Sequence, residues 1–476
     1  MIKSFIKNSF IYTVGALLTR GIGIILIPIY TRYLTPTEYG VVDLFMILGS
    51  IVSLTIALEI FQAVARLYPE AEESTKKYYV STAFWFTVFV YLLYFVISII
   101  YADFFTIILL DDISYLNVYY LATGAITTSG FFYFTSNQLK WQLLPKKAII
   151  VSILNLSIIA VISLYLLVFL NLKVESMFIA QIFANIIASG FSIYYARENY
   201  KFIFIYTKLK EMIELSFPLV FSSVSIFFAL FIDRMLIKEF MGLEELGVYG
   251  LAYKFAAITS LVMIGFQSSL TPLVYRNYKE DSTPETISKL FNVFTILALV
   301  IVSGSILFSK ELVLLMSTKD YYAAAPLIPI IVMAVFFSNM YIFAPGLGIA
   351  KKSKIITVIS LINVFINGLL NYILIPIFGL EGAALATLVS SIIVFFVYVS
   401  VSSRYYFIPY DSKKLLGNFL MLVVITYTTN LLLNEITIFN FTLKLIVLCL
   451  VSFVSMYTLL SKDNMNKILE MIKINK

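Results

Sequence analysis

The feature that most constrains this chain is a series of apolar runs that recur from one end to the other, with charged residues gathered between them. A helix needs about 20 apolar residues to cross the hydrocarbon core of a bilayer. The runs lack the alternation of a barrel strand, so helices are the remaining way to satisfy their backbone groups in lipid. The sequence therefore predicts an all-α polytopic membrane protein of about fourteen transmembrane helices. We expect spans near residues 10–31, 40–65, 80–101, 115–136, 148–170, 175–196, 215–237, 247–270, 290–308, 323–346, 355–376, 381–402, 415–433 and 440–460.

The charges predict how these spans are oriented. Charged residues form 13% of the chain, about half the share of a soluble protein. Of the 34 Lys and Arg residues, 25 fall at the two termini and in the loop after every second span, against six in the opposite loops. Basic loops stay in the cytoplasm, so both termini are expected there. Because the net charge of +7 is spread over short loops, nucleic acid is not an expected partner.

Two residue types are informative through their scarcity. Histidine is absent and Cys449 is the only cysteine. These counts exclude His-based metal sites, Ser/His/Asp catalysis and an intramolecular disulfide framework. We therefore expect no metal, no cofactor and no enzymatic activity.

The chain contains an internal duplication at an offset near 207 residues. EYGVVDL at 38–44 returns as ELGVYGL at 245–251, and KAIIV at 147–151 returns as KIITV at 354–358. Six spans in each copy make the copies parallel. We expect a six-helix bundle over 1–205, a second over 206–402, and a two-helix appendix with a cytoplasmic tail over 403–476. Residues that both copies share, Glu38 with Glu245 and Gly40 with Gly247, are predicted to be architectural.

Charges found in one copy only point to function. At the equivalent positions of Arg20, Lys254, Asp233 and Arg234 the other copy has Phe227, Ile47, Leu26 and Ile27. The fold thus tolerates an apolar residue at each site, although a charge at the bilayer centre costs about 2.5–3.5 kcal/mol or more. Transporters with parallel repeats bind their substrate between the two halves, so inward-facing charges are candidates for that path.

Arg20 is the strongest of these candidates. It lies near the middle of the first span, where Thr13, Ala16 and Gly23 share its helical face. We expect Arg20 to point into the bundle, either toward the substrate or in a buried ion pair. Lys254 is expected to point inward or to reach the membrane interface.

The remaining intramembrane charges lie nearer the ends of their spans. Arg234 is expected near the outer end of span seven, where its side chain reaches the interface, and Asp233 lies on a small, polar stripe of the same span. Asp43 and Glu59 lie near the two ends of span two. Each carboxylate is expected either to pair with a cation or to bind a coupling ion.

Three segments together resemble a known family. They are IPIYTRYLTPTEYG at 27–40, Asp233-Arg234, and GVYGLAYK at 247–254. The chain resembles the polysaccharide transporter family, the Wzx-type oligosaccharide flippases of the multidrug/oligosaccharidyl-lipid/polysaccharide exporter superfamily. The resemblance implies a V-shaped pair of bundles in the cytoplasmic (inner) membrane that flips an undecaprenyl-diphosphate-linked oligosaccharide by alternating access. It also implies a cationic cavity, to which Arg20, Lys254 and Arg234 would contribute, and it allows for a polysaccharide polymerase and chain-length machinery as partners.

Several alternatives stay open at this point. A multidrug exporter of the same superfamily would share the fold, but cationic drugs call for a cavity of unpaired carboxylates. A lipid II flippase is a closely related alternative. A membrane-embedded polymerase or glycosyltransferase would need a larger extramembrane loop than the sequence offers, and a purely structural protein would not require charges in one repeat only. Coupling to a proton, to sodium or to the membrane potential is left open.

Overall fold

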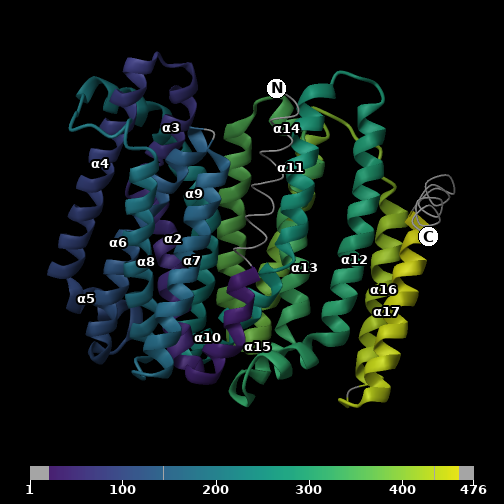
Figure 1. Ribbon diagram of the computed structural model, residues 1–476. Coiled ribbons are helices and arrows are strands. Elements are labelled where there is room, and N and C mark those ends of the chain that lie inside the picture. Colours follow the sequence, from purple (N-terminus) through teal and green to yellow (C-terminus); the bar gives the residue numbers. More distant parts are fainter. Residues whose placement is uncertain (1–20, 143, 434, 460–476) are drawn as a thin grey trace, which may run out of the picture. The chain divides into compact units, whose positions relative to one another are not determined.

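Figure 1 shows the computed structural model, which describes residues 21–142, 144–433 and 435–459. These residues form helices joined by short connections, and the described part contains no strand. The all-α class predicted from the apolar runs is confirmed. The chain divides into two compact units, Met1–Gly250 and Leu251–Lys476, and each is described by itself.

The first unit is built from helix Gly21–Tyr33 and from α2 to α9. In chain order the helices are Gly21–Tyr33, α2 Pro36–Thr55, α3 Ile60–Leu67, α4 Glu73–Ile100, α5 Ala102–Leu110, α6 Leu116–Trp141, α7 Pro145–Val168, α8 Lys173–Tyr195 and α9 Tyr206–Met241. The unit ends within α10, Leu243–Ala257. Helices α6, α7 and α8 pack together, and α9 packs along α2, α3 and α4.

The second unit continues with α11 to α17. Its helices are α11 Ser260–Asn277, α12 Thr283–Met316, α13 Leu327–Asn339, α14 Gly346–Ile349, α15 Ser353–Ser402, α16 Ser412–Leu432 and α17 Ile438–Leu459. Helix α13 packs on α15, while α16 and α17, yellow in Figure 1, lie side by side against α12. The domain boundaries expected near residues 205 and 402 stay predictions.

Many of these helices can cross a membrane. Eight helices in the described ranges have the length and hydropathy of a span, and a ninth results if α5 and the helix that follows it, bent by 119°, are taken as one. Two further apolar helices, Gly21–Tyr33 and Leu327–Phe343, are shorter. The chain is thus a multi-pass membrane protein, and the number of fourteen spans stays a prediction.

Span two differs from the continuous helix expected over 40–65. It breaks between α2 and α3, where Leu58 and Glu59 have φ angles of 50° and 52°. A right-handed helix cannot continue through two residues in the left-handed conformation, so α2 and α3 are separate helices. This conformation costs a residue with a side chain about 1–2 kcal/mol. Period and hydropathy continue across the break, which is why the sequence did not indicate it. Spans eleven and twelve form α15, which is interrupted at Gly379 with φ 59° and ψ −137°.

Local sequence explains where several helices begin. Thr35 caps α2 in a capping box: its hydroxyl accepts from the Glu38 amide, and the Glu38 carboxylate accepts from the Thr35 amide. Pro36 occupies the first turn, where no amide hydrogen is needed. Asp411 similarly accepts from the Lys414 amide at the start of α16. These caps fix the ends of helices that carry charged side chains.

Candidate functional site

The residues predicted from the sequence fall into different parts of the structure. Arg20 lies outside the described residues. Lys254 lies on α10, beyond the end of the first unit, and is partly exposed. Asp43, Glu59, Asp233 and Arg234 all lie in the first unit and are buried.

Asp43 and Arg234 form a buried ion pair between α2 and α9. Arg234 Nε donates to Asp43 Oδ2 at 3.1 Å, and the two side chains are 1% and 6% exposed. Of the two expectations for Asp43, pairing with a cation is therefore observed. The expectation that Arg234 reaches the interface is wrong, because its guanidinium turns into the bundle toward this carboxylate.

Further contacts hold the Arg234 guanidinium in place. It lies over the ring of Tyr249, 5.3 Å from the centroid, and Nη1 donates to the Leu230 carbonyl at 3.4 Å. A desolvated cation over an aromatic face gains about 2 kcal/mol. Arg234 is thus bonded to α2 through Asp43, to α10 through Tyr249, and to its own helix.

A second ion pair lies one turn further along α9. Lys238 Nζ lies 2.6 Å from Asp111 Oδ2 and donates to the Ile108 carbonyl at 3.1 Å. The Lys238 side chain is 2% exposed and that of Asp111 is 67% exposed. The sequence did not reveal this pair, although the four-residue spacing from Arg234 places both cations on one face of α9.

The loop beside this pair contains a second acidic residue, Asp112. The Ser114 amide donates a hydrogen bond to the Asp112 carboxylate, and this bond lowers the pKa of that carboxyl.

Close packing of α2 against the start of α10 surrounds these pairs. A Cβ atom on Gly40 would lie 2.2 Å from the Leu243 carbonyl oxygen, and one on Gly247 would lie 1.8 Å from that of Pro36. Neither position can hold a larger residue without moving backbone. The architectural role predicted for this repeated glycine pair is confirmed.

The other two predicted carboxylates, Glu59 and Asp233, are also buried. Glu59 is 1% exposed and lies at the break between α2 and α3. Asp233 is 1% exposed and precedes Arg234 on α9. Coupling-ion binding by either residue stays a prediction. Within the described ranges, no three Cys, Asp or Glu side chains lie close enough together to hold a metal ion.

The second unit contains one more buried ion pair that sequence reasoning missed. Lys444 Nζ on α17 donates to Glu311 Oε1 on α12 at 2.6 Å, with side chains 1% and 14% exposed. Lys444 lies within the span expected over 440–460, and only the packing of α17 shows that it faces α12. Apolar residues of α12, α16 and α17 pack beside it, namely Ile296, Leu299, Leu422, Val451 and Leu459.

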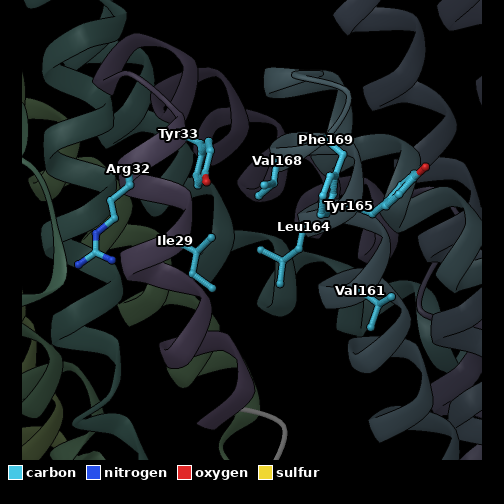
Figure 2. A pocket seen from close by; sticks show the side chains of 8 residues that line it. All are labelled: Ile29, Arg32, Tyr33, Val161, Leu164, Tyr165, Val168 and Phe169. Carbon is cyan, nitrogen blue, oxygen red and sulfur yellow. The ribbon is translucent and has the colours of Figure 1, made fainter.

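An apolar groove of about 640 Å³ lies between helix Gly21–Tyr33 and α7. Figure 2 shows Ile29 and Leu164 facing each other across it, with Tyr165 and Phe169 on the α7 side. Arg32 borders the groove, but its guanidinium points away from α7. The walls are therefore suited to contact with lipid chains rather than to charge recognition.

The comparison with known families decides the relationship. The family described as Polysaccharide biosynthesis protein matches residues 5–278, more than half of the chain. The chain belongs to this family. The resemblance carried by residues 27–40 and 247–254 is thereby confirmed. A second family, MatE, matches residues 218–373.

The chain is also similar to an individual protein, over a shorter stretch than the family match. A probable low-salt glycan biosynthesis flippase of Haloferax volcanii is 26% identical over 175 residues, which cover 36% of this chain and 37% of that protein. The matched stretch thus spans little more than a third of the relative's length.

Two solved structures share the fold. The lipid II flippase MurJ in an inward closed conformation superposes with a TM-score of 0.78 at 14% identity, covering 94% of this chain and 98% of that one. An inward-facing multidrug resistance MATE transporter gives a TM-score of 0.67 at 12% identity, covering 81% and 94%. At these identities the similarity concerns the fold.

Proposed function

We propose that this protein is a flippase that moves an undecaprenyl-diphosphate-linked oligosaccharide, a repeat unit of O-antigen, capsule or exopolysaccharide, across the cytoplasmic membrane by alternating access. The family match over residues 5–278 carries this proposal. The glycan flippase among the relatives and the flippase and exporter folds support it. The lipid tail can stay in the bilayer while the polar head crosses.

The substrate's diphosphate requires fixed positive charge in a site of low dielectric constant. We assign this role first to Arg20, a charge near the middle of span one that the other repeat replaces with Phe227. Lys254 is the second candidate. Arg234 is the third, although in this structure its guanidinium is bonded to Asp43. We assign no reaction chemistry to the protein.

The same proposal includes its orientation and surroundings. The distribution of Lys and Arg supports two cytoplasmic termini in an inner membrane. A flippase in this position would receive a lipid-linked glycan made on the cytoplasmic side. It would deliver that glycan to a polymerase and chain-length machinery on the other side.

The role of Arg20 is tested by replacing it with Ala and, as the matched control, with Lys. In a deletion strain, Arg20→Ala should abolish surface polysaccharide while the protein remains at normal abundance in the membrane. Arg20→Lys, which keeps the charge, should retain a measurable part of the activity. Normal polysaccharide with Arg20→Ala would contradict the assigned role. Proteoliposomes loaded with a polyprenyl-diphosphate oligosaccharide would test flipping by the parent protein directly.

One alternative is favoured by a specific observation. The MatE match over residues 218–373 is the reason to keep a multidrug exporter as the second candidate. Such a protein would change the drug sensitivity of a deletion strain and leave its polysaccharide intact. A lipid II flippase, the third candidate, would instead be required for cell-wall growth.

A further inference from the structure

Two ion pairs join α9 to other elements of the first unit. We propose that Asp43–Arg234 and Lys238–Asp111, here called the α9 latch, hold one end of the transport path closed and separate when that end opens. The charge distribution of the sequence places this end on the non-cytoplasmic side. The proposal concerns conformation and does not depend on which molecule is transported.

One face of α9 carries the cations of both pairs. Arg234 and Lys238 lie one helical turn apart on the same face of α9. Their carboxylates come from different elements, since Asp43 lies on α2 and Asp111 follows α5. The two pairs therefore join α9 to two elements at once, and a movement of α9 away from them must break both.

The groups around the two pairs limit the free-energy cost of separating them. Separating a buried pair is costly when it leaves a bare charge in a medium of low dielectric constant. Here each pair has one member with a second source of stabilisation. Arg234 keeps the Tyr249 ring on α10 and the Leu230 carbonyl on its own helix. Asp111, with a side chain 67% exposed, is hydrated by solvent. The latch can thus open without stranding both charges of either pair.

The surrounding contact surface is also suited to separation. Where α2 meets α10, Gly40 and Gly247 bring backbone against backbone, with no room for a side chain. At these two positions no side chain has to be withdrawn when the helices part. In the interior of α9, Pro218 removes one backbone hydrogen bond and provides a site at which the helix can bend.

The internal duplication explains why these elements should move apart. By the repeat, α9 and α10 begin the second copy, whereas α2 and α5 belong to the first. Alternating access in such proteins is largely a rocking of one copy against the other. Each pair of the latch joins one residue from each copy, which is the arrangement that a gate requires.

Distances between spin labels test the latch directly. We would label Asn117→Cys on α6 and Glu239→Cys on α9 of the full chain, with Cys449→Ser to remove the native thiol, in lipid nanodiscs. Both positions are exposed and neither takes part in the latch. The parent should give mainly a short distance. Asp43→Asn or Lys238→Gln should raise the ratio of the long to the short population about tenfold.

A matched control comes from the same end of the first unit. Lys173 lies 2.8 Å from Glu38 and joins α8 to α2, both from the first copy. Lys173→Gln should leave the distance distribution unchanged. The exchange Asp43→Arg with Arg234→Asp should restore the short distance if attraction between the two side chains holds the closed state.

Two observations distinguish opening of the latch from local unfolding: the width of the distance distribution, and the return of the short distance in the charge-exchange variant. A broad distribution that the charge exchange does not narrow would overturn the proposal, since the pair would then only support the fold. Distances that stay short in both single variants and in their combination would also overturn it. Either result leaves the flippase assignment standing, because that assignment is tested by polysaccharide and by flipping in proteoliposomes.

Discussion

The two units each bury ion pairs in helical bundles, yet they surround them differently. In the first unit, Arg234 has an aromatic ring and a carbonyl beside its carboxylate, and the partner of Lys238 is exposed. In the second unit, Lys444 has Glu311 as its partner, and Glu311 Oε2 receives no hydrogen bond from the described residues. The ion pairs of the first unit thus have additional stabilising contacts or solvent beside them, whereas the pair of the second unit is enclosed by the bundle.

This difference separates a contact that can open from one that fastens. Glu311 is the one ion-pair partner of Lys444 among the described residues, so separating the pair would leave a buried charge uncompensated there. The pair therefore fastens α17 to α12. When the pairs of the first unit separate, Arg234 keeps its contacts with the Tyr249 ring and the Leu230 carbonyl. Asp111 is then hydrated by solvent. If this comparison is correct, removing one partner should cost more in the second unit than in the first.

The largest effect is expected at Glu311. Glu311→Leu leaves the Lys444 ammonium buried and unpaired, which should cost about 3–5 kcal/mol of stability. Thermal unfolding of the detergent-solubilised protein would measure this loss. The double variant with Lys444→Met should recover the melting temperature of the parent, because an apolar pair of similar volume suits this setting. A double variant as unstable as Glu311→Leu alone would contradict this interpretation.

The next largest effect is expected at Gly247. Gly247→Ala places a Cβ atom 1.8 Å from the Pro36 carbonyl oxygen, so backbone must move at a cost of about 3 kcal/mol. The melting temperature should fall clearly. Gly190→Ala on α8, where no atom lies within 4 Å of the added Cβ, is the control and should be neutral or slightly stabilising. Equal behaviour of the two variants would refute the close contact between α2 and α10.

A smaller loss is expected at Asp43. Asp43→Asn weakens the bond to Arg234, but the guanidinium retains Tyr249 and the Leu230 carbonyl. We expect a loss of about 1–2 kcal/mol, within the range for a lost hydrogen bond to a charged group. The same thermal assay ranks it against Glu311→Leu. A loss at Asp43 that matches or exceeds the one at Glu311 would remove the difference between the two units.

The smallest effect is expected at the Lys173–Glu38 pair. Lys173 is 48% exposed, and exposed ion pairs contribute about 0–1 kcal/mol. Lys173→Gln should therefore shift the melting temperature little, and raised salt should reduce even that shift. A loss comparable to that of Asp43→Asn would show that burial is not what distinguishes these pairs.

Part of the candidate site followed from the sequence. The duplication predicted that the fold tolerates an apolar residue in place of Asp233, Arg234 or Lys254, and it predicted that Gly40 and Gly247 are architectural. The sequence did not reveal Lys238–Asp111 or Lys444–Glu311, because in the sequence the members of those pairs do not differ from other charges in loops or near span ends, and only helix packing brings them together. Nor did it reveal the break at Leu58 and Glu59, since hydropathy and period are the same for a helix and for a helix with a short interruption.

The sequence by itself determined the all-α class, the multi-pass character and the family of this protein. Transfer into a bilayer depends on local composition, and the family signature is contiguous along the chain. Only the tertiary structure decided which charges meet. Arg234 and Asp43 are 191 residues apart, and Lys444 and Glu311 are 133 apart. A charged side chain in a membrane must find a partner, but which partner it finds depends on how the helices pack.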